Sequence, residues 1–187
     1  MDALPIFLRQ VRSRSKKHQR AMAVLERERL SGQMVAVLRQ ELDSMVGIIY
    51  LLTQSAERRG LLVEASVRGD KWSQPNLSAS VTDREMVGLA QNLQGWARSV
   101  YKFGCAFIHL SVLHDYNGRD PLEQLPAQER EDMLDHCRNY HGGPSGDNAN
   151  FSDLVSYLPP VLEKITVNLE CYLEDLEKEN LHNAAQV

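Results

Sequence analysis

Two short segments of the chain place histidines next to an acid or an arginine. The first segment, KFGCAFIHLSVLHDY, carries His109 and His114 in an apolar run and continues to Asp115. The second segment, DHCRNYHGGP, carries Arg138 and His141. A neutral histidine beside a carboxylate can act as a general base, and an arginine can hold a phosphate through two hydrogen bonds. These residues predict proton transfer beside an anion, provided that the fold brings both segments together.

The same residues also have structural interpretations. His114 falls on the predicted seam of its helix and can bond to a carbonyl, Asp115 can end that helix, and His141 can lie in a turn. His109 lies about 140° around the helix from His114, in a basic row with Lys102. This is not the HxxxH spacing by which two histidines share a metal. We predict no metal site and no cofactor, with a metal-dependent enzyme using His109, His114, Asp115 and His141 as an alternative.

Two further motifs are assigned to structural roles. YHGGPSGD has glycines that would let backbone amides approach a phosphate, but it lacks GKS or GKT and follows no strand, so a helix-ending turn is predicted. Glu41 falls near a buried stripe and Arg39 at its edge, which predicts a charge pair across helices. The catalytic candidates are therefore Arg138, His141 and His114, and the binding candidates are Asp115, Tyr140, Lys102 and His109.

Composition predicts one cytoplasmic globular domain. The chain has 187 residues, a net charge of −4 and three cysteines without a CxxC spacing. We expect no signal peptide and no membrane span, because no apolar run reaches about 18 residues. Residues 1–30 hold eight Lys and Arg against three acids. This basic segment can touch phosphate or dock on the acidic body of a second copy.

The spacing of apolar residues predicts an all-α bundle of four to five main helices with one long central helix. A basic N-terminal helix or arm is expected within 1–32, the bundle domain over 33–180 and a polar tail over 181–187. The second helix is expected over 33–59, ending at Gly60. A capping box at Thr82 and Glu85 opens the long helix, which is expected to continue to about Leu113. A short helix is expected over 126–139, and the last main helix is expected to begin at Pro160.

Two resemblances bear on function. FGCAFIHLSVLHDY with YHGGP resembles a block of small bacterial helical proteins carried in mobile gene cassettes, over most of 33–178. The architecture also resembles the HEPN superfamily of helical, often dimeric proteins, common in toxin–antitoxin and phage-defence systems. Many of its members cut RNA without a metal, through an arginine and a histidine four to six residues apart on one helix. Here Arg138 and His141 have only two residues between them, which departs from that motif.

Two function hypotheses follow, and whether the protein is an enzyme stays open. The resemblance implies an RNA-binding or RNA-processing protein in which Arg138 holds the scissile phosphate and His141 or His114 moves the proton. The alternative is a non-catalytic bundle that binds a protein or a small apolar ligand. A homodimer is expected in either case, with RNA or a protein as possible partners and no membrane. The first hypothesis requires Arg138 and His141 to be exposed and close together, and the second predicts an apolar pocket.

Overall fold

The computed structural model describes residues 3–74, 79–109, 111–116, 118–146 and 148–184. Within these residues the chain is all-helical and forms no strand, which confirms the all-α class. The elements are α1 (Ala3–Arg27), α2 (Ser31–Leu52), α3 (Ala56–Arg68), α4 (Asp83–Ala90), α5 (Ala97–Ile108), the 3-10 helix η1 (Val112–Asp115), α6 (Ala127–His141), α7 (Phe151–Val155) and α8 (Leu158–Ala184).

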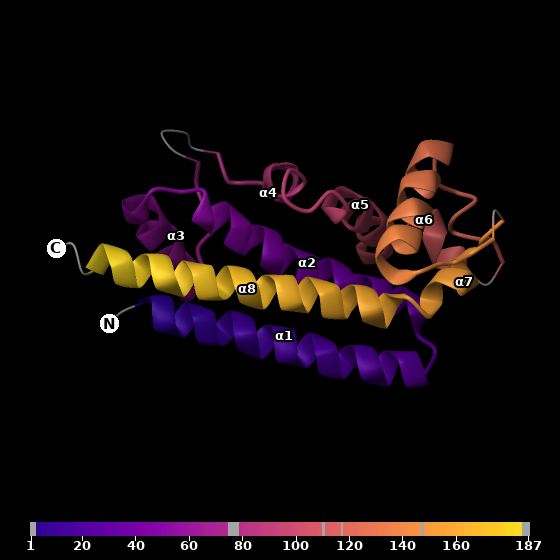
Figure 1. Ribbon diagram of the computed structural model, residues 1–187, viewed down its shortest axis with the longest axis horizontal. Helices are drawn as coiled ribbons and strands as arrows, with labels where there is room; N and C mark the ends of the chain where they lie inside the picture. The colour runs from indigo at the N-terminus through magenta and orange to yellow at the C-terminus, as the bar shows by residue number, and fades with distance from the viewer. Residues whose placement is uncertain (1–2, 75–78, 110, 117, 147, 185–187) are drawn as a thin grey trace.

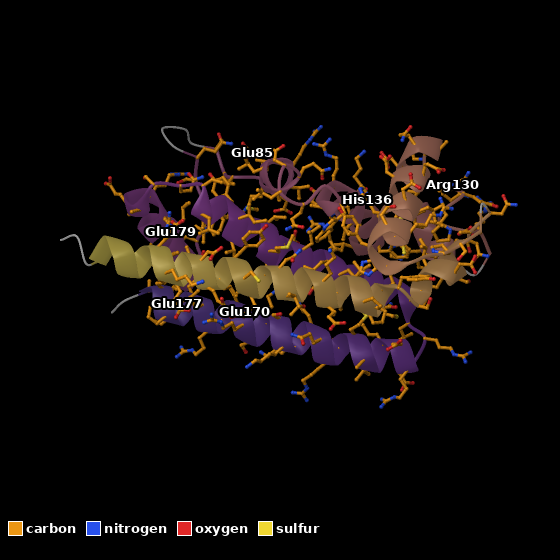
Figure 2. All side chains as sticks on the ribbon, in the orientation of Figure 1. Glu85, Arg130, His136, Glu170, Glu177 and Glu179 are labelled. Atoms are coloured by element: carbon orange, nitrogen blue, oxygen red, sulfur yellow. The ribbon has the colours of Figure 1, made fainter. Side chains whose placement is uncertain are left out.

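Three long helices, α1, α2 and α8, run side by side along the molecule, and α3 lies at one end of them (Figure 1). Helices α4 and α5 pack on another side of α2, while α6 stands steeply across the opposite end. The basic helix α1 is packed into this arrangement, since it buries Phe7, Leu8 and Met22. Arg12 of α1 also bonds Glu170 at 2.8 Å and Glu177 at 3.2 Å, both on α8 and labelled in Figure 2.

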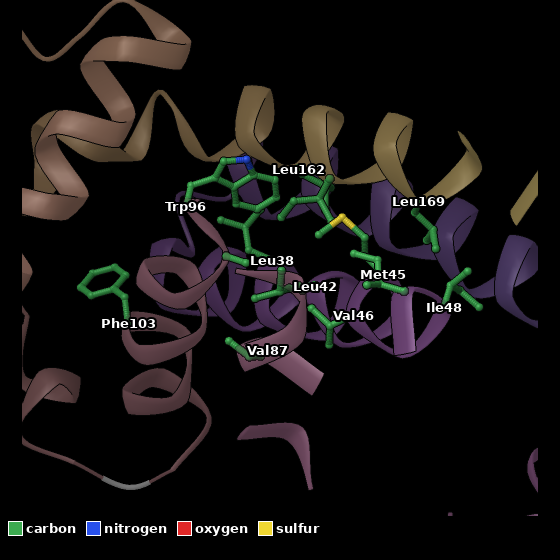
Figure 3. Packing of buried hydrophobic residues seen from close by; sticks show 14 of the residues in the cluster. Leu38, Leu42, Met45, Val46, Ile48, Val87, Trp96, Phe103, Leu162 and Leu169 are labelled. Carbon is green, nitrogen blue, oxygen red and sulfur yellow. The ribbon is translucent and has the colours of Figure 1, made fainter. Parts of the chain in front are cut away.

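Helix α2 is the centre of the core because it contacts α1, α4, α5 and α8. Its predicted stripe is confirmed: Met34, Leu42 and Met45 are fully buried and Leu38 is 4% exposed. Figure 3 shows Leu38 beside Trp96 and near Leu162 of α8, so side chains from three helices meet at this point. Burial of such apolar surface is the main favourable contribution to the fold.

The predicted helix over 33–59 is wrong at its C-terminal end. Helix α2 ends at Leu52, and the hydroxyl of Ser55 caps α3 by accepting from the amide of Arg58. Gly60 therefore lies inside α3, where an added Cβ would meet nothing within 4 Å. Ser55 as the cap and Glu57 in the first turn satisfy the free amides at the start of a new helix. The chain therefore begins α3 here, although the apolar pattern predicted that the preceding helix would continue.

The predicted long helix from Thr82 to Leu113 is also divided. The capping box at Thr82 and Glu85 is confirmed, but α4 ends at Ala90 and α5 begins at Ala97. Gln91 bridges this break, because its side chain donates to the carbonyl of Gly95 and accepts from the amide of Arg98. These bonds supply partners for the backbone groups that a helix end leaves free. A second break after Ile108 leads into η1.

Candidate functional site

An apolar pocket of about 80 Å³, partly open to solvent, lies between α2, α5, α6, α7 and α8. Its floor includes Leu38, Trp96 and Phe103, which are at most 7% exposed. Val161 of α8 and Met133 of α6 form part of its walls. Mostly apolar linings with a few convergent polar groups are typical of ligand sites in helical bundles.

The polar side chains of this pocket come from α5, α6 and α8. The Nδ1 atom of His136 lies 3.2 Å from the hydroxyl of Ser99. The Nζ atom of Lys164 lies 4.4 Å from the centroid of the Tyr140 ring, which is half exposed. A cation over an aromatic face is held by the quadrupole of the ring. With His141 included, the polar groups around the apolar floor are thus one positive charge, that of Lys164, and two imidazoles.

His141, a predicted catalytic residue, belongs to this pocket. It lies in the last turn of α6 and is half-buried. Burial, and secondarily the charge of Lys164, lowers the pKa of His141 below its usual 6.5. The imidazole is therefore kept neutral by an apolar surrounding and a neighbouring cation, both of which oppose a second positive charge.

This lowered pKa predicts that acid destabilises the fold through His141. Between the folded-state pKa of His141 and 6.5, the unfolded chain binds more protons than the folded chain. The contribution of neutral His141 to the free energy of unfolding is therefore complete above about pH 6.5 and is lost as the pH falls. The free energy of unfolding in urea should fall less between about pH 8 and about pH 5 in His141→Gln than in the wild type. Equal losses would contradict this assignment.

Cys137 lies beside the imidazoles but is not a nucleophile. Burial raises the pKa of its thiol to about 11, although the charge of Arg138 opposes the shift. The thiolate is the reactive form of cysteine, so at neutral pH Cys137 is a protonated apolar group of the pocket wall. At 7% exposure it packs as a small hydrophobic residue.

Arg138, the predicted phosphate-binding residue, holds a loop in place. Its Nε donates to the carbonyl of Pro144 at 3.2 Å, and its Nη2 donates to the carbonyl of Gly146 at 3.1 Å. Its Nη1 bonds Asp135 at 3.2 Å and lies 3.8 Å from Glu131. The guanidinium is thus engaged with two carbonyls and two carboxylates. To bind a phosphate it would have to exchange several of these partners.

His114 and Asp115 of the first segment do not join this pocket. His114 and Asp115 lie on η1 and are exposed, whereas the sequence placed His114 on a buried seam. The ring of His114 bonds the carbonyl of His109 at 2.9 Å and touches the edge of Phe107. Asp115 forms a long, exposed ion pair with Arg119. Within the described residues no hydrogen bond or ion pair connects His114 or Asp115 to α6.

His109 and Lys102 also occupy separate places. His109 is exposed and follows the last residue of α5, so it shares no helical row with Lys102. Lys102 pairs with Glu129 of α6 at 2.5 Å. It lines a more polar hollow beside the apolar pocket, together with Arg98 and Asp132. Its charge is compensated there, so Lys102 ties α5 to α6.

Two buried charges on α2 bind neighbouring helices. Glu41 is fully buried and accepts from Ser15 at 2.5 Å and from Thr166 at 3.3 Å, with the Nδ1 atom of His18 at 2.5 Å. Glu41 therefore makes a polar contact across helices, as predicted, with His18 among its partners. Because every contact is satisfied within the core, this cluster fixes how α1, α2 and α8 pack rather than forming an open site.

Arg39 forms a second buried cluster on the opposite side of α2. It pairs with Asp43 and, at 3.1 Å, with Asp83 of α4, and its guanidinium lies 4.1 Å from the centre of the Tyr101 ring. Its Nε is 3.4 Å from the sulfur of Cys105. The charge pair with Asp83 crosses helices as the sequence predicted. Arg39 thereby joins α2 to α4 and α5.

The most informative site residues missed in the sequence are Lys164, His136 and Tyr157. Lys164 falls beside the apolar stripe of α8 at Leu162 and Ile165, and this edge position was its available signal. A lysine there can bury its carbon chain while its ammonium reaches the surface. His136 and Tyr157 had no comparable signal, because their place in one pocket depends on the steep placement of α6 (Figure 2).

Comparisons with known proteins add no family. No family model matches the sequence, and no curated protein or solved structure matches it either. Among the described residues, no group of three or more His, Cys, Asp and Glu side chains is placed to hold a metal ion. None of the helices in this part of the chain combines the length and the apolar character needed to cross a bilayer.

Proposed function

We propose that the protein binds a small, compact apolar molecule in the pocket between α5, α6 and α8. The observation that supports this most directly is the pocket itself, in which the buried floor of Leu38, Trp96 and Phe103 opens toward a half-buried polar edge. Native interiors are close-packed and leave few voids larger than a water molecule. An apolar hollow at this junction therefore leaves unsatisfied contacts that a ligand can make.

The size of the pocket limits the ligand. An engineered apolar cavity of about 150 Å³ binds benzene, and this pocket holds about 80 Å³ with an opening to solvent. That is about half of the benzene-binding volume, so we expect the apolar part of the ligand to be no larger than one aromatic ring or a short branched chain, with the rest of the ligand at the opening. The neutral thiol of Cys137 and the tied Arg138 supply no nucleophile or free guanidinium, so binding rather than catalysis is the activity proposed for the pocket.

The expected result is that a neutral ligand of this size stabilises the protein and changes the fluorescence of Trp96. The probe is 2-phenylethanol, because its apolar part is a single ring and Trp96, which forms part of the floor, can report its binding. A ligand present at 100 times its dissociation constant raises stability by about 2.7 kcal/mol. Fluorescence titration and thermal unfolding measure the two effects independently.

A pocket-filling substitution provides the control. Val161→Trp places a bulky side chain on the pocket wall, and Val167→Trp places the same side chain on an exposed position of the same helix. Binding should disappear in the first variant and persist in the second, with both helical by circular dichroism. Binding that survives Val161→Trp would place the ligand elsewhere, and absence of binding in the wild type would refute the proposal for ligands of this size.

RNA processing is our second proposed function. Arg138 and His141 share the last turn of α6, where residues three apart lie on one face. The test is incubation with mixed RNA in EDTA, beside a double variant, Arg138→Ala with His141→Ala. Cleavage by the wild type alone would support this proposal. Cleavage by both or by neither would contradict the assignment to these two residues. The expected homodimer and protein partner remain predictions, which sedimentation and pull-down experiments can test.

A further inference from the structure

We propose that the ligand of this pocket is a small carboxylic acid whose apolar ring enters the pocket and whose carboxylate lies against Lys164. This inference rests on the proposed binding function and specifies its ligand class. It depends on three features: the positive charge of Lys164 at the pocket, the lack of a neighbouring carboxylate, and the separation of that charge from the apolar floor.

The charge at the pocket is positive and uncompensated. No aspartate or glutamate is among the residues that line it. Within the described part of the chain, Lys164 forms no ion pair, and its neighbour is the face of the Tyr140 ring. A protein carboxylate usually compensates a half-buried ammonium. Here that partner is missing from the protein, and an anionic ligand supplies the complementary charge.

His141 adds to this preference for an anion. It lies close enough to Lys164 for the ammonium to oppose its protonation. A carboxylate near both groups would attract the ammonium and accept a hydrogen bond from the imidazole. A cationic ligand would instead meet the like charge of Lys164. The pocket therefore selects anionic over cationic ligands by repelling the cation as well as by attracting the anion.

The nearest acids are already engaged or lie in the adjoining hollow. Asp135 is bonded by Arg138, and Glu129 is paired with Lys102 at 2.5 Å. Asp132 lines the adjoining polar hollow rather than the apolar pocket. Because of where these acids lie, the uncompensated positive charge is on the side of the pocket formed by α8 and the end of α6. That arrangement places a carboxylate near Lys164 and away from His136, which both hollows share.

The experiment compares three ligands of nearly equal size, phenylacetate, 2-phenylethanol and 2-phenylethylamine, by fluorescence titration at low salt and neutral pH. Wild type is expected to bind phenylacetate at least about tenfold more tightly than the alcohol, and the amine most weakly. In Lys164→Met, which keeps an unbranched side chain without the charge, acid and alcohol should bind within about threefold of each other. Lys17→Met removes an exposed charge on α1 and should keep the wild-type preference.

The outcomes separate this inference from the function on which it rests. Equal binding of acid and alcohol in the wild type, both blocked by Val161→Trp, would overturn the inference and leave the binding function standing. An acid preference that persists in Lys164→Met would overturn the assignment to Lys164. Failure of all three ligands to bind the wild type would overturn both. An acid preference lost in Lys164→Met and kept in Lys17→Met is the result that the inference requires.

Discussion

Glu41→Ala is expected to lower the free energy of unfolding by about 3–5 kcal/mol, the range found when one partner of a buried pair is removed. The carboxylate is fully buried and accepts from Ser15, contacts His18 and accepts from Thr166. Its removal leaves these groups on α1 and α8 without their shared partner and opens a cavity between three helices. Urea unfolding followed by circular dichroism measures the change.

Companion variants separate charge from hydrogen bonding in this cluster. Glu41→Gln keeps an acceptor oxygen and should cost less than alanine, whereas Gln40→Ala, on an exposed neighbour, should change stability by under about 0.5 kcal/mol. A double variant, Glu41→Leu with His18→Leu, removes both partners and should recover much of the loss. If Glu41→Ala cost no more than Gln40→Ala, the cluster would not contribute to the packing of these helices.

Gly104→Ala is expected to destabilise the fold by about 3 kcal/mol, at the upper end of the usual cost of overpacking. A Cβ atom on Gly104 of α5 would lie 2.6 Å from the Cβ of Arg39 on α2. A Cβ cannot rotate away, so the two helices must move apart. The separation would also disturb the contacts of Arg39 with Asp83 and Tyr101. Chemical denaturation measures the loss.

The matched control, Gly60→Ala, is expected to change stability in the opposite direction. Gly60→Ala makes the same substitution inside α3, where the new Cβ meets nothing within 4 Å. Alanine should stabilise this helix by about 0.5–1 kcal/mol, because glycine loses more backbone freedom on folding. Equal effects at the two positions would show that α5 and α2 are not in close contact at Gly104.

The apolar pattern predicted the helices that face the core, and it failed where local capping ended them. The stripe of α2 was correct because its residues at three- and four-residue spacing all face neighbouring helices. Ser55 started a new helix, and Gln91 bonded across the break near Gly95. Each break resets the helical phase. His114 therefore left the seam on which an unbroken helix would have placed it, and it became exposed.

The buried cluster around Glu41 could be partly predicted from the sequence. Four apolar positions of α1, Phe7, Val11, Met22 and Leu25, leave a gap in the middle of its apolar stripe. Ser15 and His18 fill this gap at the regular spacing, and both are buried. Polar residues within a buried stripe need a polar partner, and Glu41 on α2 is that partner. The sequence thus contained both halves of the contact, on different helices.

The pocket was not readable in the same way. Its walls come from α2, α5, α6, α7 and α8, and its polar groups meet because α6 stands across the end of the long helices (Figure 1). Helix crossing angles depend on how side-chain ridges fit together, which one sequence does not reveal. Of the predicted site residues, only His141 and Tyr140 line this pocket.

The position of α8 over α2 has a consequence for how the chain is synthesised. The bond between Glu41 and Thr166 joins residues 125 positions apart, and that between Arg12 and Glu170 joins residues 158 apart. Until α8 has left the ribosome, α2 lacks its largest cover and the buried carboxylate lacks one donor. The growing chain therefore carries an apolar face of α2 that stays uncovered until α8 emerges, the kind of surface that chaperones bind.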